Sequence, residues 1–178
     1  MPVAGAVAEN GGLSCPSTRL ESVALTPIPN LVNHRQHLGT MFEKLQLKSP
    51  QMTESADNCF GITDWTFHVA ALTANELQYL SVLCQQQGWG FTYSNVQCHI
   101  KPQGKDKAVG LLQVLREYSP EYTASEIVTV GDSPNHESLF EQRYFAISVG
   151  VANVSKYSSP VAASTSIHND CGLRRRIF

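Results

Sequence analysis

Apolar residues recur at helical spacing in three segments of the chain. The first stripe spans residues 31 to 45, and Ser49-Pro50 marks its end. The second begins after Thr73 and Glu76, whose side chains and spacing are typical of a capping box. The third spans residues 107 to 115 and follows a polar hinge rich in proline and glycine. These patterns predict three helices, beginning near residues 31, 74 and 107.

Segments rich in β-branched, aromatic and other apolar residues alternate with these stripes. The segments that predict strands are residues 3–13, 58–69, 89–100, 126–131 and 144–153. The first of them is expected to be buried and to stop at the turn-forming Asn10-Gly11-Gly12. Residues 14 to 30 contain three prolines and predict a loop.

The order of these elements indicates two layers of different character. After residue 104, apolar strands alternate with helices, which predicts an α/β core with a buried parallel sheet. The preceding segment has a mixed α+β pattern. We therefore expect a core strand at 1–13, an inserted α+β domain at 14–103 and more of the core at 104–155. The Ser-rich tail at 156–178 ends near Arg174, Arg175 and Arg176 and is expected to be frayed and solvated.

Composition narrows the class of protein. The 178 residues are 42% hydrophobic and 16% charged, which is ordinary for a globular domain. A net charge of -2 gives no reason to expect binding to nucleic acid or to an anionic membrane. The five cysteines form no C-x-x-C pair, which favours reduced thiols and a cytoplasmic location. The sequence shows no signal peptide and no apolar run long enough for a membrane span.

A candidate site lies in "IVTVGDSPNHESLF", residues 127 to 140. Asp132 follows a strand directly, and ligands bind at the carboxyl ends of strands in open α/β sheets. Ser133 can cap the next helix, with Pro134 at its first position. A carboxylate beside unpaired N–H groups suits Mg²⁺ that also binds phosphate. Lys107 would lie at the same edge of the sheet if the strand that precedes its helix lies beside strand 126–131. The residues G-D-S-P-N also suit an ordinary turn without any ligand.

The sequence resembles the haloacid-dehalogenase-type (HAD) phosphatases that carry a large type II cap, in particular the sucrose-phosphate-phosphatase and mannosyl-phosphoglycerate-phosphatase group. "GDSPNHESLF" is similar to their fourth motif and "GKDKAVGLL", residues 104 to 112, to their third. Two further segments resemble other parts of the family. The segment "SVGVANV" at 148–154 is similar to the strand and Asn-containing loop that follow the fourth motif, and "AVAENGGL" at 6–13 is similar to the core strand and Asn-Gly turn that lead into the cap. The likeness covers residues 3 to 155 and implies a HAD-like core with an inserted cap.

The resemblance implies the chemistry of phosphate-monoester hydrolysis. In this family an aspartate attacks the phosphoryl group, and a second aspartate two residues later is the general acid and base. Asp132 would be the Mg²⁺ ligand and Lys107 the cation that faces the phosphate. Further residues implied on the phosphate side are Ser133, Asn135, His136 and Asn153, with Asn10 at the cap hinge. The expected substrate is a small phosphorylated molecule such as a sugar phosphate.

The nucleophile motif D-x-D-x-[TV] is absent, because no two of the aspartates are two residues apart. We expect that motif and the second one to lie upstream of Met1, so that this chain is a truncated and inactive form with possible self-association. His136 stands where the family has aspartate. A histidine there is expected to leave Mg²⁺ binding weak or lost, because a protonated ring would oppose the metal.

Other interpretations stay open. The chain could be a non-catalytic binding or regulatory module derived from this fold. Gly131-Asp132-Ser133 also matches the start of a serine hydrolase family, with His168 and Asp170 as partners. His99 could contact substrate. The aromatic residues Trp65, Phe67 and Trp89 could line a sugar, although aromatics on such strands are more often core.

Overall fold

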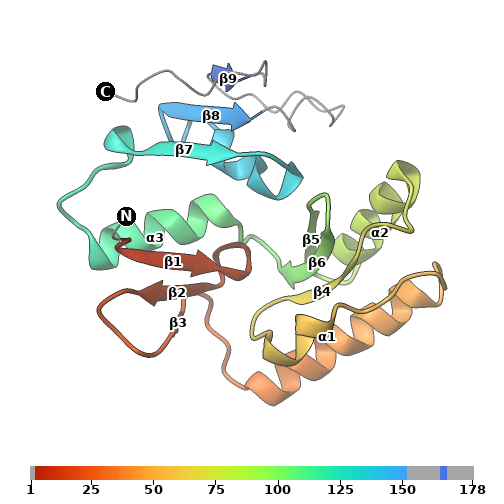
Figure 1. Cartoon of the computed structure of the whole chain (residues 1–178). Helices are drawn as coiled ribbons and strands as arrows, with labels where there is room; N and C mark the ends of the chain where they lie inside the picture. The colour runs from red at the N-terminus through yellow and green to blue at the C-terminus, as the bar shows by residue number, and fades with distance from the viewer. Residues whose placement is uncertain (1–2, 152–164, 168–178) are drawn as a thin grey trace.

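The computed structural model describes residues 3–151 and 165–167, which form three small sheets and three α-helices (Figure 1). The first sheet is antiparallel and contains β1 (Gly5–Ala8), β2 (Leu13–Pro16) and β3 (Val23–Ala24), in that order. Two expectations were wrong here. Residues 14 to 30 are not all loop, because β2 and β3 pair beside β1. Strand β1 itself is largely exposed rather than buried.

The segment expected to form the cap contains a sheet covered by two helices, and we call this part the cap below. Helix α1 (Leu31–Gln46) is capped by the side chain of Asn30, and α2 (Ala74–Gln86) begins with the predicted capping box of Thr73 and Glu76. The strands are β4 (Trp65–His68), β5 (Trp89–Tyr93) and β6 (Gln97–Pro102), arranged in the antiparallel order β4-β6-β5. Gly88, at a φ of 78°, lies between α2 and β5.

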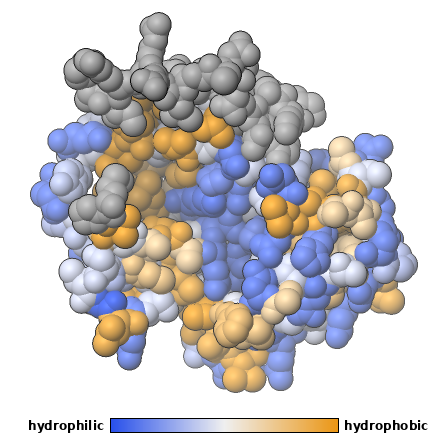
Figure 2. Space-filling view, viewed as in Figure 1, coloured by the Kyte–Doolittle hydropathy of each residue, from blue (hydrophilic) through white to orange (hydrophobic). Residues whose placement is uncertain are grey.

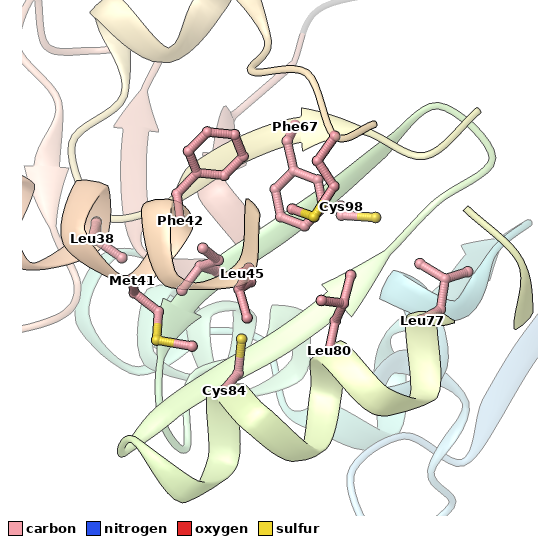
Figure 3. Close-up of a cluster of buried hydrophobic side chains, with 11 residues drawn as sticks. Leu38, Met41, Phe42, Leu45, Phe67, Leu77, Leu80, Cys84 and Cys98 are labelled. Atoms are coloured by element: carbon pink, nitrogen blue, oxygen red, sulfur yellow. The ribbon is translucent and has the colours of Figure 1, made fainter. Parts of the chain in front are cut away.

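The two faces of the cap sheet differ in chemistry. Phe67, Cys98 and Ile100 are fully buried against α1 and α2 and form one apolar cluster with residues such as Leu45 and Leu80 (Figure 3). The registers Thr66↔His99 and Thr92↔His99 place a polar row on the opposite face, because neighbouring residues of a strand point to opposite sides. That polar face is the one free to meet the rest of the molecule.

The remaining elements form the α/β layer. These are α3 (Lys107–Tyr118), the 3₁₀ turn η3 (Ala124–Glu126), β7 (Val128–Gly131), the 3₁₀ segment η4 (Pro134–Phe140), β8 (Ile147–Val151) and β9 (Thr165–Ile167). Strands β7, β8 and β9 run parallel in that order, as predicted for this part. The strand β9 lies in the segment expected to be a frayed tail, so that expectation was wrong for these three residues.

One predicted strand is shorter than expected. Residues 58–69 are a strand only in β4, because the 3₁₀ turn η2 (Ala56–Phe60) comes first. The side chain of Asn58 accepts a hydrogen bond from the Thr66 backbone N–H at 2.7 Å and donates to the Thr66 carbonyl at 2.7 Å, which holds η2 against β4.

The thiols of the cap core are chemically quiet. Cys84 and Cys98 are buried, and burial raises the pKa of each thiol to about 12. Cys15 and Cys59 are exposed, and none of the four cysteines within the described residues is in a disulfide.

No helix in the described part is both long and apolar enough to cross a bilayer.

One face of the α/β sheet is open and apolar. Val128 and Val130 on β7 are 55% and 56% exposed, and Ile147 on β8 is 48% exposed. Within the described residues, β7 pairs only with β8, so its other edge has no strand beside it. An unpaired edge next to exposed valines is typical of a sheet that can accept another strand.

Candidate active site

Asp132 lies directly after β7, at the carboxyl end of the parallel strands. The buried Ser133 hydroxyl is 2.7 Å from Asp132 Oδ1 and 2.8 Å from Asn135 Oδ1, and its single hydrogen can be donated to either. Ser133 makes no side-chain capping bond to η4, so the expectation that it caps the next helix was wrong. Its hydroxyl instead fixes the loop around the Asp132 carboxylate.

Lys107 is connected to this loop through His136. Lys107 Nζ is 2.8 Å from His136 Nε2, and His136 Nδ1 is 3.2 Å from Asp132 Oδ1. A lysine ammonium can only donate, so Nε2 accepts, and in the neutral ring the proton is on Nδ1, which lies 3.2 Å from both Ser133 Oγ and Asp132 Oδ1. Burial and then the charge of Lys107 lower the pKa of His136, which keeps the imidazole neutral.

The proximity of Lys107 and Asp132 has a different origin from the one expected. Strand β6, which leads to α3, belongs to the cap sheet and does not lie beside β7. The two residues meet because α3 packs on η4, where the Ala108 N–H donates to Ser138 Oγ at 3.2 Å. Burial lowers the pKa of Lys107, and the carboxylates of Asp132 and Asp64 oppose that shift.

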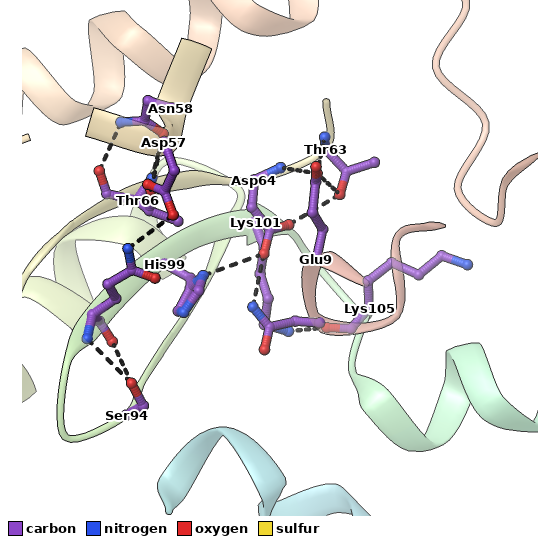
Figure 4. A network of polar contacts seen from close by, with 12 residues as sticks. Glu9, Asp57, Asn58, Thr63, Asp64, Thr66, Ser94, His99, Lys101 and Lys105 are labelled. Carbon is purple, nitrogen blue, oxygen red and sulfur yellow. Dashed lines mark hydrogen bonds and ion pairs between the residues drawn. The ribbon is translucent and has the colours of Figure 1, made fainter. Parts of the chain in front are cut away.

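The predicted hinge residue Asn10 lies where β1 turns toward the cap. It adopts a left-handed conformation with a φ of 50°, and its Nδ2 donates to Asp64 Oδ2 at 2.7 Å. Beside it, the Glu9 carboxylate accepts hydrogen bonds from the backbone N–H groups of Ile62, Thr63 and Asp64 (Figure 4). This 3₁₀ turn, η1 (Glu9–Gly11), is therefore bonded to the segment that directly precedes β4.

Asp64 is a site residue that the sequence did not indicate. Its side chain is only 3% exposed, and the Thr63 hydroxyl donates to it at 3.1 Å. His99 Nδ1 lies 3.6 Å from Asp64 Oδ2, too far for a hydrogen bond. No motif surrounds Asp64; its role depends on contacts with Asn10, 54 residues away in the sequence.

A pocket of about 180 Å³ joins the cap to the loop after β7. Thr92 and Lys101 line it from the polar face of the cap sheet, Asn10 from the hinge, and Asn135 and Glu137 from η4. Figure 2 shows hydrophilic residues gathered in the hollow between the β7 layer and the cap. The pocket thus brings Asn10 and Asn135 to one cavity beside the Lys107–His136–Asp132 chain.

The remaining candidates from the sequence either lie outside the described residues or pack in the cap core. Asn153, His168 and Asp170 lie outside the described residues, so the serine-hydrolase alternative has no geometry here. Phe67 is fully buried in the cap core. Trp65 stacks against Phe42 and lies under the Arg35 guanidinium, on the helix side of the sheet. These aromatic residues therefore pack in the core and do not line the pocket.

The residues present fit a Mg²⁺ ion only in part. The described residues contain no group of three or more histidine, cysteine, aspartate or glutamate side chains that could hold a metal. Asp132 offers one partly exposed carboxylate, and His136 Nδ1 lies 3.2 Å from its Oδ1. Mg²⁺ usually takes one or two carboxylates together with phosphate oxygens and water, so Asp132 could contribute one ligand to such a site.

Comparison with solved structures shows the fold. A Thermoplasma acidophilum protein is 17% identical with a TM-score of 0.63, matching 88% of this chain and 62% of its own length. A sugar phosphatase of HAD subclass IIB is 14% identical with a TM-score of 0.63, and the match covers 93% of this chain and 70% of that one. The C-terminal domain of trehalose-6-phosphate phosphatase from C. albicans is 12% identical with a TM-score of 0.62, covering 92% and 66%.

The chain therefore has the α/β fold of HAD-superfamily phosphatases with a cap, as the sequence motifs implied. It spans 62 to 70% of the length of these three structures. No protein-family sequence profile matches the chain, and no curated protein matches it by sequence. At 12 to 17% identity, the comparison shows a shared fold and leaves activity to be argued from the site.

Proposed function

We propose that this chain carries the cap and the phosphate-side residues of a Mg²⁺-dependent phosphatase for small phosphate monoesters, such as sugar phosphates. The observation that carries the proposal is the placement of Lys107 beside Asp132, at the carboxyl end of β7 and under the polar face of the cap. The shared fold supports it, because two of the similar structures are a sugar phosphatase and a trehalose-6-phosphate phosphatase.

Each residue has a distinct part in this proposal. Lys107 offers a partly buried ammonium that neutralises phosphate oxygens, and burial strengthens that attraction. Asp132 would hold Mg²⁺, which when bound neutralises developing charge on the phosphoryl group. Ser133 and Asn135 hold the loop that presents the Asp132 carboxylate. The aspartate nucleophile of such a reaction is not among this chain's residues, so we propose that the chain alone is inactive.

A second candidate is a non-catalytic binding module with the same fold. The observation that favours it is His136, whose ring bridges Lys107 and Asp132. Both groups that would meet phosphate and metal are thereby engaged with each other. Such a site can bind an anion once Lys107 turns from the ring, without any chemistry.

Hydrolysis is expected to be absent. The purified chain with Mg²⁺ should not release p-nitrophenol from p-nitrophenyl phosphate above the buffer rate, because it has no aspartate pair that could form an aspartyl-phosphate. Phosphate release by the wild type and by Asp132→Ala is the measurement. Turnover that co-purifies with the wild type and disappears in Asp132→Ala would refute the inactive state.

Anion binding at Lys107 is the positive test of the proposed function. Inorganic phosphate should shift the backbone amide signals of residues 107–110 and 131–136 in ¹H–¹⁵N spectra. Lys107→Met should remove most of that effect, since its ammonium contacts the loop through His136. The control is Lys48→Met, which removes the same charge from an exposed site on the cap. Equal shifts in both variants would show that the site is not the phosphate site.

Magnesium is expected to bind only in the millimolar range, because one carboxylate beside a lysine and a histidine makes a poor cage. His136→Asp should tighten binding about tenfold or more, since it replaces the ring beside Asp132 by a second carboxylate. Isothermal titration of both proteins measures the change, with Ser133 left intact to hold the loop. Micromolar affinity in the wild type, or no gain in the variant, would contradict the placement of Asp132 as ligand.

A further inference from the structure

We propose that the 180 Å³ pocket binds the alcohol part of the substrate, and that it takes a group rich in O–H or N–H donors and without negative charge. The inference rests on the proposed function for the neighbouring phosphate side. Its evidence is the Asn10 side chain, the balance of donors and acceptors, and the charge of the lining.

The Asn10 side chain is built into the pocket wall and has one polar atom left over. It is 5% exposed, and its Nδ2 is held by Asp64 at 2.7 Å. Its Oδ1 is buried and has no hydrogen-bond partner among the described residues. A buried acceptor without a partner is costly, by roughly 1–3 kcal/mol, so a ligand donor placed there would be favoured. Because Oδ1 can only accept, the ligand must bring an O–H or N–H.

Acceptors outnumber donors along the rest of the lining. Asp106, Glu137 and Glu141 all face the cavity. Lys101 is the single lysine or arginine among its lining residues, and its ammonium already donates to the Lys105 carbonyl. The hydroxyl groups of Thr92 and Ser138 can donate or accept as needed. This arrangement suits a polyol or an amine better than a group that offers only acceptors.

The charges of the residues that line the pocket also disfavour a ligand with negative charge. Glu141 is paired with Arg143, which offsets one negative charge. Glu137 makes no side-chain hydrogen bond or ion pair among the described residues, and Asp106 uses Oδ1 to cap α3 at Val109. Burial lowers the pKa of Lys101, with Asp64 and Asp106 as opposing carboxylates, so this ammonium is already balanced. A carboxylate or a second phosphate on the ligand would therefore meet uncompensated acidic groups.

The size of the pocket limits the ligand. A volume of about 180 Å³ lies below the roughly 300–1,000 Å³ that is usual for drug-sized ligands. A monosaccharide or a smaller polyol is the appropriate scale.

Three monosaccharides that differ in charge test the inference on the full chain. Glucosamine, glucose and glucuronate share a ring and carry positive, zero and negative charge. We expect titrations followed by ¹H–¹⁵N spectra to shift the amides of Asn10, Thr92 and Glu137. Glucuronate should bind about two- to fivefold more weakly than glucose, as is usual for a single partly exposed charge contact. If glucose and glucosamine bind equally, the hydroxyl groups make the contacts. If glucosamine binds more tightly, its ammonium also contacts the acidic residues of the pocket.

Three variants show which residues cause the charge preference and the binding. Glu137→Gln removes one acidic group from an exposed position and should narrow the gap between glucosamine and glucuronate. Glu121→Gln makes the same change at an exposed position outside this pocket and should leave the gap unchanged. Asn10→Gly keeps the left-handed turn, removes Oδ1 and should weaken binding of all three sugars.

The outcomes separate this inference from the proposed function. Glucuronate binding as tightly as glucosamine, no shifts at the pocket amides, or equal effects of Glu137→Gln and Glu121→Gln would each overturn the inference. None of these results depends on phosphate. Loss of phosphate binding at Lys107 with intact sugar selectivity would instead reject the proposed function and leave the pocket assignment standing.

Discussion

Gly11→Ala is expected to destabilise the fold by about 2 to 5 kcal/mol, the sum of a backbone strain and an overpacking penalty. Gly11 has a φ of 91°, which side chains rarely adopt. An added Cβ would also collide with the carbonyl oxygen of Asp106, at the N-terminus of α3. The turn that carries Asn10 would have to move away from the helix that carries Lys107. The substitution should therefore weaken both folding and the candidate site.

Variants at two other glycines distinguish the backbone strain from the overpacking penalty. Gly88 has a φ of 78° but nothing within 4 Å of an added Cβ, so Gly88→Ala measures the backbone strain alone and should cost about 1 kcal/mol. Gly110 has ordinary helical dihedrals, but its Cβ would lie 2.5 Å from Gly11 Cα, so Gly110→Ala measures the packing penalty reduced by the roughly 0.5–1 kcal/mol that alanine gains over glycine within a helix. Urea unfolding of the three variants gives the comparison. If Gly11→Ala costs no more than Gly88→Ala, the tight contact between the turn and α3 is not present in solution.

The helices were predictable because their signals are local. The capping box of Thr73 and Glu76 and the spacing of apolar residues in α1 act within one or two turns of helix. The same is true of the Lys107 start of α3. The strands were harder: β2 and β3 are short and lie among prolines, and their pairing with β1 is a contact between segments. Strand β9 is likewise defined by its pairing with β8 rather than by its own sequence.

In the candidate site, too, local features were predictable and contacts between distant segments were not. The position of Asp132 at a strand end followed from its own neighbours in the sequence. The contact of Lys107 with His136 joins residues 29 apart, and that of Asn10 with Asp64 joins residues 54 apart. Neither distance is encoded in a motif of this chain alone. Asp64 directly precedes β4 and belongs to no motif, and only the folded chain shows that its carboxylate is buried against Asn10, which lines the pocket.

Hydrogen exchange should divide the molecule into a slow cap and a faster α/β layer. The cap has a continuous core in which Leu80, Cys84 and Phe67 are fully buried between helices and sheet. The β7 strand has exposed valines and no described neighbour on one edge. Local opening of β7 exposes little additional apolar surface, so its free-energy cost should be lower than that of opening α2. We expect amides of α2 to exchange at least about tenfold more slowly than those of β7, which corresponds to about 1.4 kcal/mol.

The comparison needs a monomeric sample, because association through the open β7 edge would protect the same amides. Sedimentation at two concentrations establishes the state, and amides at the centre of the cap sheet, at residues 98–100, serve as an internal reference for slow exchange. Val130→Lys places a charge on the exposed face and should leave α2 unchanged while discouraging association. If β7 and β8 amides in a monomer outlast those of α2, the open edge is not a weak point. The sheet must then be completed by residues beyond those described, and the exposed face of Val128 and Val130 would be covered in solution.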